Sequence, residues 1–336
     1  MIPRSLEMEV TALASMSADR RQAIKAGAAF DKPAEVGYCR DIRAARSRAR
    51  NTPRASMTVA LSPLVAGPRR CDLEQLVGGW ALLPVSIDRV ASLKRSDIGK
   101  GRAVPSVAVR LVSVEGATVA VVDVHGVLTR WGWADDASGS TAIMADVIRQ
   151  LAADADVDAI ALHVDSPGGS VGGIAGLGDA VFEARHAKPT VAIVDELAAS
   201  GAYWVASQAS AIFASNAMSR VGSIGAYAVI WDFSEALKAR GIRINVFRSG
   251  PLKGAGIDAL SDAQRAALQR EVDETAATFK GFIRRGRGID AKLLDGLATG
   301  EVFRPTFAKE AGLIDGVLSF NEVVYALARS VKGVAR

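Results

Sequence analysis

From residue 107 onward, the sequence predicts an α/β fold with a mainly parallel sheet covered by helices. Residues 119–124 consist mostly of valine, which is typical of a buried strand. Ile143, Val147 and Leu151 then recur at the spacing of one helix face. Because strand-like and helical segments alternate in this way, right-handed helical crossovers are expected between parallel strands. An active site is then expected on loops at the carboxyl ends of the strands.

The later elements continue this alternation. Further strands are expected at residues 159–164, 190–194, 211–214 and 242–247. Further helices are expected at residues 174–182, 233–240 and 261–285, with a helix also starting near residue 200. Asp232 is expected to cap the second of these helices, and Ser261 with Gln264 has the spacing of a capping box.

The chain is expected to have three segments. Residues 1–55 form a basic, flexible extension, residues 56–104 a small mixed or helical segment with a linker, and residues 105–330 the folded domain. Residues 1–110 hold 19 basic and 10 acidic side chains, in a chain whose net charge is +5. The positive excess therefore lies in the N-terminal part, and the predicted domain is slightly acidic.

The composition excludes several classes of protein. Hydrophobic residues make up 49% and charged residues 23%, which is ordinary for a globular protein. Cys39 and Cys71 cannot build a disulfide framework and fit a reducing compartment. No uninterrupted apolar run approaches ~20 residues, so we expect no membrane span and a cytoplasmic location. The arginine-rich segment 40–54 lacks aromatic residues for base stacking, so we expect no nucleic-acid binding.

A glycine-rich loop is the first candidate for chemistry. Residues 165–170 read Asp-Ser-Pro-Gly-Gly-Ser directly after an expected strand. Gly168 and Gly169 can adopt backbone angles closed to other residues, and their N–H groups are suited to binding an oxyanion. A tight strand-to-helix turn would need the same glycines for geometry alone, so this motif leaves both interpretations open.

Residues 168–172 also match the G-x-S-x-G pattern of a nucleophile elbow, with Ser170 at the centre. That interpretation requires an acid and then a histidine later in the chain. The three histidines are His125, His163 and His186, and none follows position 186. We therefore reject an α/β-hydrolase. We expect His163 to be a strand residue and the other two to be loop or helix residues.

Ser200 is the second candidate. It lies in the small-residue segment Ala-Ala-Ser-Gly-Ala-Tyr at 198–203, and apolar residues continue at helical spacing from Trp204. A serine at a helix N-terminus lies at the positive end of the helix dipole, which helps to stabilise an alkoxide-like transition state. For an isolated serine, a helix N-cap is the commoner explanation.

Lys253 is the third candidate, in the segment Ser-Gly-Pro-Leu-Lys at 249–253. Burial would favour its neutral amine, which can act as a base, whereas an exposed loop lysine is the ordinary case. A serine protease without a usable histidine needs another base, and lysine is the known substitute. Because each candidate segment follows a different expected strand, all three are expected to meet at one sheet edge.

These segments together resemble the signal peptide peptidase A family of serine proteases, which includes phage head-maturation proteases and has the ClpP/crotonase fold. The resemblance runs from about residue 107 to 317 and includes Val-Gly-Ser-Ile-Gly at 221–225. Near its end, Pro305 stands where a glycine is commoner in the family. The resemblance implies Ser200 as nucleophile, Lys253 as general base, and an oxyanion hole from Gly168, Gly169 and Gly201.

The resemblance also implies peptide-bond hydrolysis through an acyl-enzyme, without a metal or cofactor. The substrate is expected to bind as an extended peptide, and the subunits to form a homo-oligomeric ring. Because no membrane anchor is apparent, we expect a phage or prophage capsid-maturation protease in the bacterial cytoplasm. It would associate with proheads and with capsid or scaffold proteins.

Four alternatives remain. A bacterial peptidase similar to signal peptide peptidase would use the same chemistry on other substrates. A ClpP-like Ser-His-Asp protease is disfavoured, because no histidine follows Ser200. A crotonase-type acyl-CoA enzyme shares the fold and a comparable oxyanion loop but would not require Ser200 and Lys253. A non-catalytic assembly protein would keep the fold alone.

Overall fold

The computed structural model describes residues 57–59, 80–82, 107–132 and 138–333. The expected extension at residues 1–55 lies outside the described residues. So does most of the expected segment at 56–104, apart from two short strands. The expected segment boundaries therefore stay predictions.

The described residues form an eleven-stranded mixed sheet. Its main order is β1-β3-β4-β6-β7-β8-β11, and the central pairs β4–β6, β6–β7 and β7–β8 are parallel. The predicted α/β class with a mainly parallel sheet is confirmed. The strands are β1 (Met57–Val59), β2 (Trp80–Leu82), β3 (Val107–Val114), β4 (Ala117–Thr129), β5 (Ser138–Ser140), β6 (Ala159–Ser170), β7 (Thr190–Ala199), β8 (Ala211–Ala214), β9 (Arg220–Gly222), β10 (Val302–Phe303) and β11 (Gly316–Val317).

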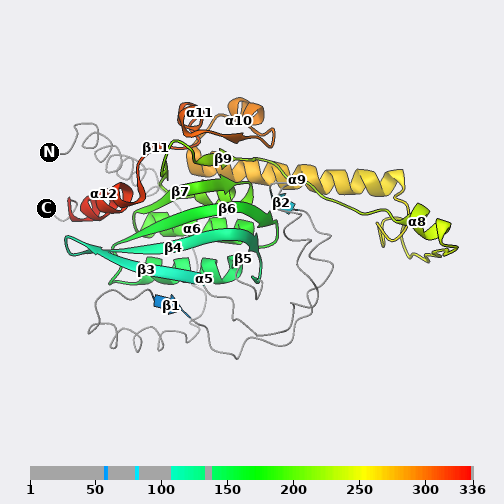
Figure 1. The fold of residues 1–336 in the computed structure, drawn as a ribbon, viewed down its shortest axis with the longest axis horizontal. Coiled ribbons are helices and arrows are strands. Elements are labelled where there is room, and N and C mark those ends of the chain that lie inside the picture. Colours follow the sequence, from blue (N-terminus) through cyan, green and yellow to red (C-terminus); the bar gives the residue numbers. More distant parts are fainter. Residues whose placement is uncertain (1–56, 60–79, 83–106, 133–137, 334–336) are drawn as a thin grey trace, which may run out of the picture.

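Helices cover both faces of this sheet (Figure 1). One face packs against α5, α6, α7 and α9, and the other against α12. The helices are α5 (Thr141–Ala153), α6 (Ile174–Ala187), α7 (Gly201–Ala206), α8 (Ser234–Ala239), α9 (Asp262–Arg287), α10 (Ala291–Leu297), α11 (Pro305–Glu310) and α12 (Phe320–Gly333).

Strand β4 shows how the sequence builds the two layers. Ala120 and Val122 belong to the apolar cluster under α5 and α6, whereas Val119 and Val121 belong to the cluster under α12. All four are fully buried, because alternate side chains of a strand point to opposite faces. A strand covered on both sides reads as a continuous apolar run, and this is the pattern found in the sequence.

The short helix α7 is buried along its whole length. Trp204 stacks on Phe279 of α9, with ring centroids 4.7 Å apart, and the Tyr203 hydroxyl donates a hydrogen bond to the Leu313 carbonyl at 2.8 Å. Helix α9 approaches so closely that a Cβ atom on Gly286 would lie 1.9 Å from the Ser207 carbonyl oxygen. The long helix α9 therefore holds α7 in a fixed position against the sheet.

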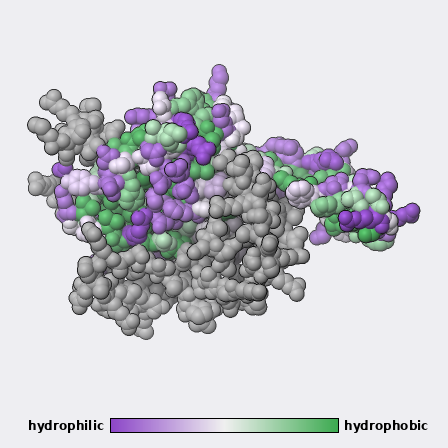
Figure 2. Space-filling view, viewed as in Figure 1, coloured by the Kyte–Doolittle hydropathy of each residue, from purple (hydrophilic) through white to green (hydrophobic). Residues whose placement is uncertain are grey.

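Beyond β9 the chain leaves the sheet and forms a projecting arm, residues 226–261, which includes α8 and leads into α9 (Figure 1). Apolar side chains are exposed on this arm: Phe247 is 96% exposed, Trp231 67% and Phe233 61%. Hydrophobic and hydrophilic residues are mixed over its surface in Figure 2. The prediction of a strand at residues 242–247 is wrong, because this apolar segment has no neighbouring strand to pair with in the single chain.

The expected helices are otherwise confirmed. The capping box of Ser261 and Gln264 opens α9, with both reciprocal hydrogen bonds formed. Helix α8 has Phe233 rather than Asp232 at its N-cap position, although the Asp232 carboxylate accepts a hydrogen bond from the Ser234 N–H. In the described part of the chain, no helix is both long enough and apolar enough to cross a bilayer.

Two glycines of α9 provide a matched test of the contact with α7. Gly286→Ala is expected to destabilise the protein by about 1–3 kcal/mol, because the new methyl group would overlap the Ser207 backbone. Gly281→Ala, with open space around it in the same helix, is expected to be neutral or stabilising by about 0.5–1 kcal/mol. Urea unfolding of both variants measures the difference. Equal stability of the two variants would contradict the proposed close contact.

Candidate active site at the ends of two neighbouring strands

The candidate site lies where β6 and β7 separate. The two strands run parallel and are last paired at Ser166 and Ala198. Residues 165–170, which the sequence predicted to be a loop, are the last part of β6 and are called the glycine loop below. Strand β7 ends next to Ser200. Two of the three segments singled out in the sequence therefore lie side by side at the carboxyl end of the sheet, as expected.

Ser200 occupies the turn between β7 and α7 in a strained backbone conformation. Its φ is +54° and its ψ is −122°, a combination that a non-glycine residue rarely adopts. Its N–H donates to the Gly222 carbonyl at 2.7 Å, and its carbonyl accepts from the Trp204 N–H at 2.9 Å. The side chain makes no capping hydrogen bond and the residue is only 2% exposed, so the N-cap explanation does not account for this serine.

Strand β9 supports this turn. Gly222 has a φ of +123°, and a Cβ atom there would lie 2.7 Å from the Glu301 carbonyl oxygen. The next residue, Ser223, is also strained at a φ of +52°, and its N–H donates to Glu301 at 2.6 Å. No sequence motif indicated a separate role for Ser223. The structure places it beside the Ser200 turn, in the glycine-rich stretch that the resemblance includes.

The two glycines of the β6 loop serve different structural purposes. Gly168 has a φ of +94°, and its N–H donates to the buried Ser166 hydroxyl at 3.1 Å. A Cβ atom on Gly169 would lie 1.7 Å from the carbonyl oxygen of Leu128 in β4. Ser166 in turn donates to the Gly126 carbonyl at 2.6 Å, so it ties the loop to β4. This anchoring role has no local signal in the sequence, because Ser166 and Gly126 are 40 positions apart.

Gly201 is the first residue of α7, and its N–H therefore has no acceptor within the helix. It follows Ser200 directly, so this N–H lies at the helix N-terminus next to the candidate nucleophile. In the described conformation, the Gly168 N–H is used by Ser166. The assignment of Gly168, Gly169 and Gly201 to an oxyanion hole stays a prediction.

A short strand from the N-terminal part of the chain pairs with the glycine loop. Strand β2 runs antiparallel to β6, with Trp80, Ala81 and Leu82 opposite Ser170, Gly169 and Gly168. It therefore lies along β6 beyond the point where β6 and β7 separate. This edge of β6 can accept an extended peptide segment.

Lys253 is not brought to Ser200 within one chain. It lies in a turn of the projecting arm, and its side chain is exposed, so the burial considered in the sequence analysis is not found. Its carbonyl accepts a hydrogen bond from Arg248 at 2.9 Å. No hydrogen bond links Lys253 and Ser200 in the described residues. The arm is drawn away from the sheet in Figure 1.

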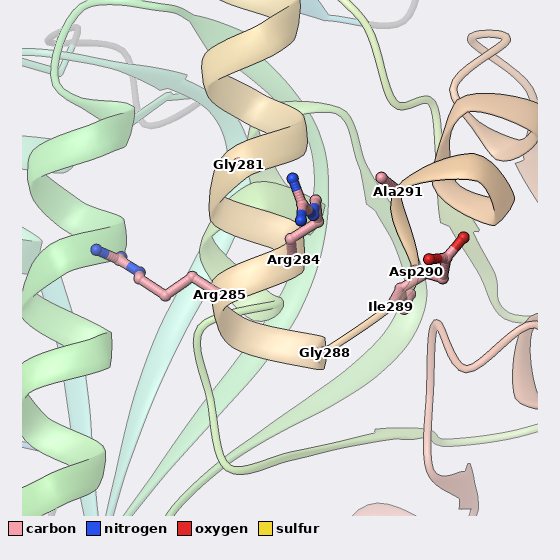
Figure 3. A pocket seen from close by; sticks show the side chains of 7 residues that line it. All are labelled: Gly281, Arg284, Arg285, Gly288, Ile289, Asp290 and Ala291. Atoms are coloured by element: carbon pink, nitrogen blue, oxygen red, sulfur yellow. The ribbon is translucent and has the colours of Figure 1, made fainter. Parts of the chain in front are cut away.

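A hollow of about 500 Å³ lies elsewhere, at the C-terminal end of α9 (Figure 3). Arg284 and Arg285 line it together with the start of α10. Figure 3 shows Arg285 pointing away towards the neighbouring helix, where it binds Asp179 at 2.8 Å and Gln208 at 2.9 Å. Because Arg285 belongs to the packing of α9 on α6 and α7, we assign no catalytic role to this hollow.

The histidines agree with the rejection of a hydrolase elbow. His163 lies in β6 and His186 in α6, as expected, whereas His125 lies in β4 rather than in a loop. Ser170 is the last residue of β6 and does not lie at a strand-to-helix turn of the kind that carries Ser200. No histidine contact to Ser200 or Ser170 occurs in the part of the chain that the structure describes.

Comparison with known proteins finds similarity to peptidases. Residues 183–334, which include Ser200 and Lys253, match the family model described as Peptidase family S49. The match covers 152 of the 336 residues. The resemblance to proteases of the signal peptide peptidase A type, which the motifs had indicated, is confirmed by this match and by the names of the relatives below.

Two relatives of this chain have names that refer to proteolysis. Protease 4 of Haemophilus influenzae is 29% identical over 209 residues, covering 61% of this chain and 34% of that protein. Capsid assembly protease C of Escherichia phage lambda is 28% identical over 273 residues, covering 80% of this chain and 53% of that protein. The chain thus spans about a third to about a half of the length of these relatives.

Solved structures give weaker similarity. An enoyl-CoA hydratase/isomerase family member matches with a TM-score of 0.39 and 19% identity, covering 67% of this chain and 76% of that one.

Gly169→Ala is expected to destabilise the glycine loop, because the added methyl group would overlap the Leu128 carbonyl. We expect the free energy of unfolding to fall by about 1–3 kcal/mol. Gly172→Ala is the matched control, because nothing lies within 4 Å of its Cβ position. Urea unfolding checks both variants, and an unchanged Gly169→Ala protein would contradict the close approach of β4.

Proposed function

We propose that the protein is a serine peptidase in which Ser200 is the nucleophile and Lys253 the general base. The observation that carries this proposal is the state of Ser200. It is a serine held at positive φ on a strand-to-helix turn, with a hydroxyl that does not cap the helix. Strain of this kind persists only where the surrounding packing maintains it, and it is concentrated at functional sites.

In the proposed reaction, the neutral Lys253 amine takes the Ser200 hydroxyl proton as the oxygen attacks the peptide carbonyl carbon. Backbone N–H groups of Gly169 and Gly201, with Gly168 if Ser166 releases it, stabilise the oxyanion. The Lys253 ammonium then protonates the leaving amine, and an acyl-enzyme forms. Water, deprotonated by the same amine, hydrolyses the ester and regenerates Ser200.

The position of Lys253 implies that the two catalytic residues come from different copies of the chain. Lys253 is exposed on an arm that also exposes Phe247 and Trp231, and large exposed apolar residues are a feature of association surfaces. Packing of the arm on a second copy would bury these side chains and carry Lys253 to that copy's Ser200. A head-to-tail contact of this kind closes into a ring when its rotation permits, which agrees with the expected homo-oligomer.

The proposed substrate is an extended peptide that pairs with the edge of β6 at the glycine loop. The antiparallel pairing of β2 with this edge supports the proposal, because it shows the type of segment that fits there. Strand addition uses main-chain hydrogen bonds, so it recognises a peptide without a strict sequence requirement. In the single chain, β2 occupies the edge that a substrate would need.

Capsid or scaffold proteins of a phage are the proposed natural substrates. The similarity to the capsid assembly protease of phage lambda, which covers most of this chain, supports this role. A bacterial peptidase similar to Protease 4 is the second candidate, supported by the similarity to that protein. A crotonase-type acyl-CoA enzyme would leave Ser200 unlabelled by a fluorophosphonate, whereas a serine peptidase would be labelled at this residue.

Ser200→Ala and Lys253→Ala are each expected to lower cleavage of a fluorogenic peptide by at least about 10³-fold. Ser200→Thr and Lys253→Arg test the chemistry more conservatively. Urea unfolding of each variant separates loss of chemistry from loss of folding. Full activity of a correctly folded Lys253→Ala protein would contradict the proposed base.

Mixing the two inactive variants tests whether the dyad forms between copies. In an equal mixture, half of the copies keep Ser200 and the other half keep Lys253. If the two variants assemble at random, a quarter of the sites between neighbouring copies have both residues, so about a quarter of wild-type activity is expected. The double variant Ser200→Ala, Lys253→Ala mixed with Ser200→Ala is the control and should stay inactive. No recovery in a mixture shown to exchange subunits would contradict assembly of the dyad between copies.

Replacing Ala81 and Leu82 together by proline is expected to release the β6 edge. Consecutive prolines remove the N–H groups that point to both sides of the strand, so β2 cannot pair. The KM for a fluorogenic peptide should then fall, while a control with valine at both positions keeps the wild-type KM. An unchanged KM in the proline variant would show that β2 does not compete with substrate.

A further inference from the structure

A second cluster of chemically active side chains lies on the opposite face of the sheet from α7. Asp123 and His125 of β4 and His163 of β6 continue the rows of residues that begin with the buried Val121 and Ala161 under α12. Asp123 and His163 are direct partners in the parallel β4–β6 pairing. The face is apolar where α12 covers it and becomes polar at Phe320, the first residue of α12, whose ring lies 5.0 Å from that of His163.

The potential ligand atoms of the three residues converge. One such atom from each of Asp123, His125 and His163 lies within 4.8 Å of the others. His163 Nδ1 and Asp123 Oδ1 are 3.2 Å apart, and the two imidazole rings have centroids 4.9 Å apart. Tetrahedral zinc with bonds of about 2.0–2.1 Å separates its ligand atoms by about 3.3–3.4 Å. The aspartate–histidine pair already has this spacing, and a ring nitrogen of His125 lies within 4.8 Å of a ligand atom of each.

The other nitrogen of His163 faces a second carboxylate. His163 Nε2 lies 3.7 Å from Oδ2 of Asp195 in β7. Asp195 is itself oriented by the Ser215 hydroxyl, which donates to its Oδ1 at 3.0 Å. A carboxylate behind the non-ligating nitrogen of a histidine is the usual outer-shell partner in metal sites, where it fixes the ring and raises its basicity. This arrangement favours Nδ1 of His163 as the ligand atom.

A cation already lies at the convergence point. Nη2 of Arg110 is 2.8 Å from Asp123 Oδ1 and 3.2 Å from His163 Nδ1, the same two atoms that would bind a metal ion. The fit of the arginine is incomplete, because its Nε is buried without a hydrogen-bond partner in the described residues. Its side chain is 38% exposed, and its guanidinium carbon lies 5.3 Å from the centre of the Phe320 ring. Asp123 and His163 therefore stabilise a positive charge at this point, and in the single chain that charge is the guanidinium of Arg110.

We propose that Asp123, His125 and His163 form a binding site for a divalent transition-metal ion of the zinc class, with Arg110 as the competing cation. Two imidazoles and one carboxylate form a ligand set that suits zinc, and three protein ligands leave a fourth position for water. The site joins β4 to β6 below the glycine loop and takes no part in the proposed peptidase chemistry. An ion bound there would stabilise the folded chain in proportion to its occupancy.

The test is a titration of the untagged full chain with Zn²⁺ by calorimetry, in a Ser200→Ala background that prevents self-cleavage. One ion per chain is expected, and Asp123→Asn, His125→Gln and His163→Gln should each weaken binding at least about 10-fold. His186→Gln, on α6, is the control and should bind as the parent protein does. Absence of binding, or parent-like affinity in any of the three ligand variants, would overturn the proposal.

Arg110→Gln provides a test that does not depend on loss of folding. Removing the competing guanidinium should raise the affinity for Zn²⁺, whereas a merely structural ion pair would give a variant that binds no better than the parent protein. Titration with Co²⁺ gives a spectroscopic readout, because intense visible absorption is the signature of a four-coordinate site and should be lost in His163→Gln. Unchanged or lower Zn²⁺ affinity in a folded Arg110→Gln protein would also overturn the proposal.

Discussion

The close contact between α9 and α7 is the constraint on which the candidate active site depends. Gly286 lets α9 lie against the Ser207 carbonyl, and Trp204 stacks on Phe279 in the same interface. Helix α7 has six residues and could not persist alone in water, so its geometry comes from this packing. Because α7 cannot shift, the residue before it must adopt the unusual backbone angles that join it to β7.

The same constraint explains why the C-terminal elements are part of the site although none of them carries a proposed catalytic group. Tyr203 binds the Leu313 carbonyl, and burial raises the pKa of its hydroxyl, so it remains a neutral donor. Arg287 pairs with Asp315 at 2.7 Å beside it, and Asp315 also accepts from the Ile212 N–H. These contacts connect α9, β8 and the segment before β11 into one support beneath α7.

Much of the fold could be predicted from the sequence, because both faces of the central strands are buried and periodicity records burial. The limits of β8 and the capping box of α9 agree with the prediction, and the other central strands differ mainly in extending further into polar residues. Residues 242–247 misled the prediction because their apolar side chains are exposed in the single chain. The spacing of apolar residues shows that a segment can pack against another surface. It does not show whether that surface belongs to the same chain.

The site was predictable in part for the same reason. Ser200 and the glycine loop follow adjacent strands, so topology alone brings them together. The position of Lys253 depends on the path of the arm, for which local sequence holds no signal. Contacts such as that of Ser166 with Gly126, or of Asp123 with His163, join residues 40 positions apart and become visible only when strand register is known.

The projecting arm has a consequence for the timing of the proposed activity. With the proposed nucleophile in a rigid core and the proposed base on an arm, a dilute chain would have no complete active site. In the proposed assembly, active sites appear as subunits meet, so local crowding acts as the switch. Such a peptidase would stay inactive while newly made copies are dilute, and it would become active where many copies are concentrated in a confined space.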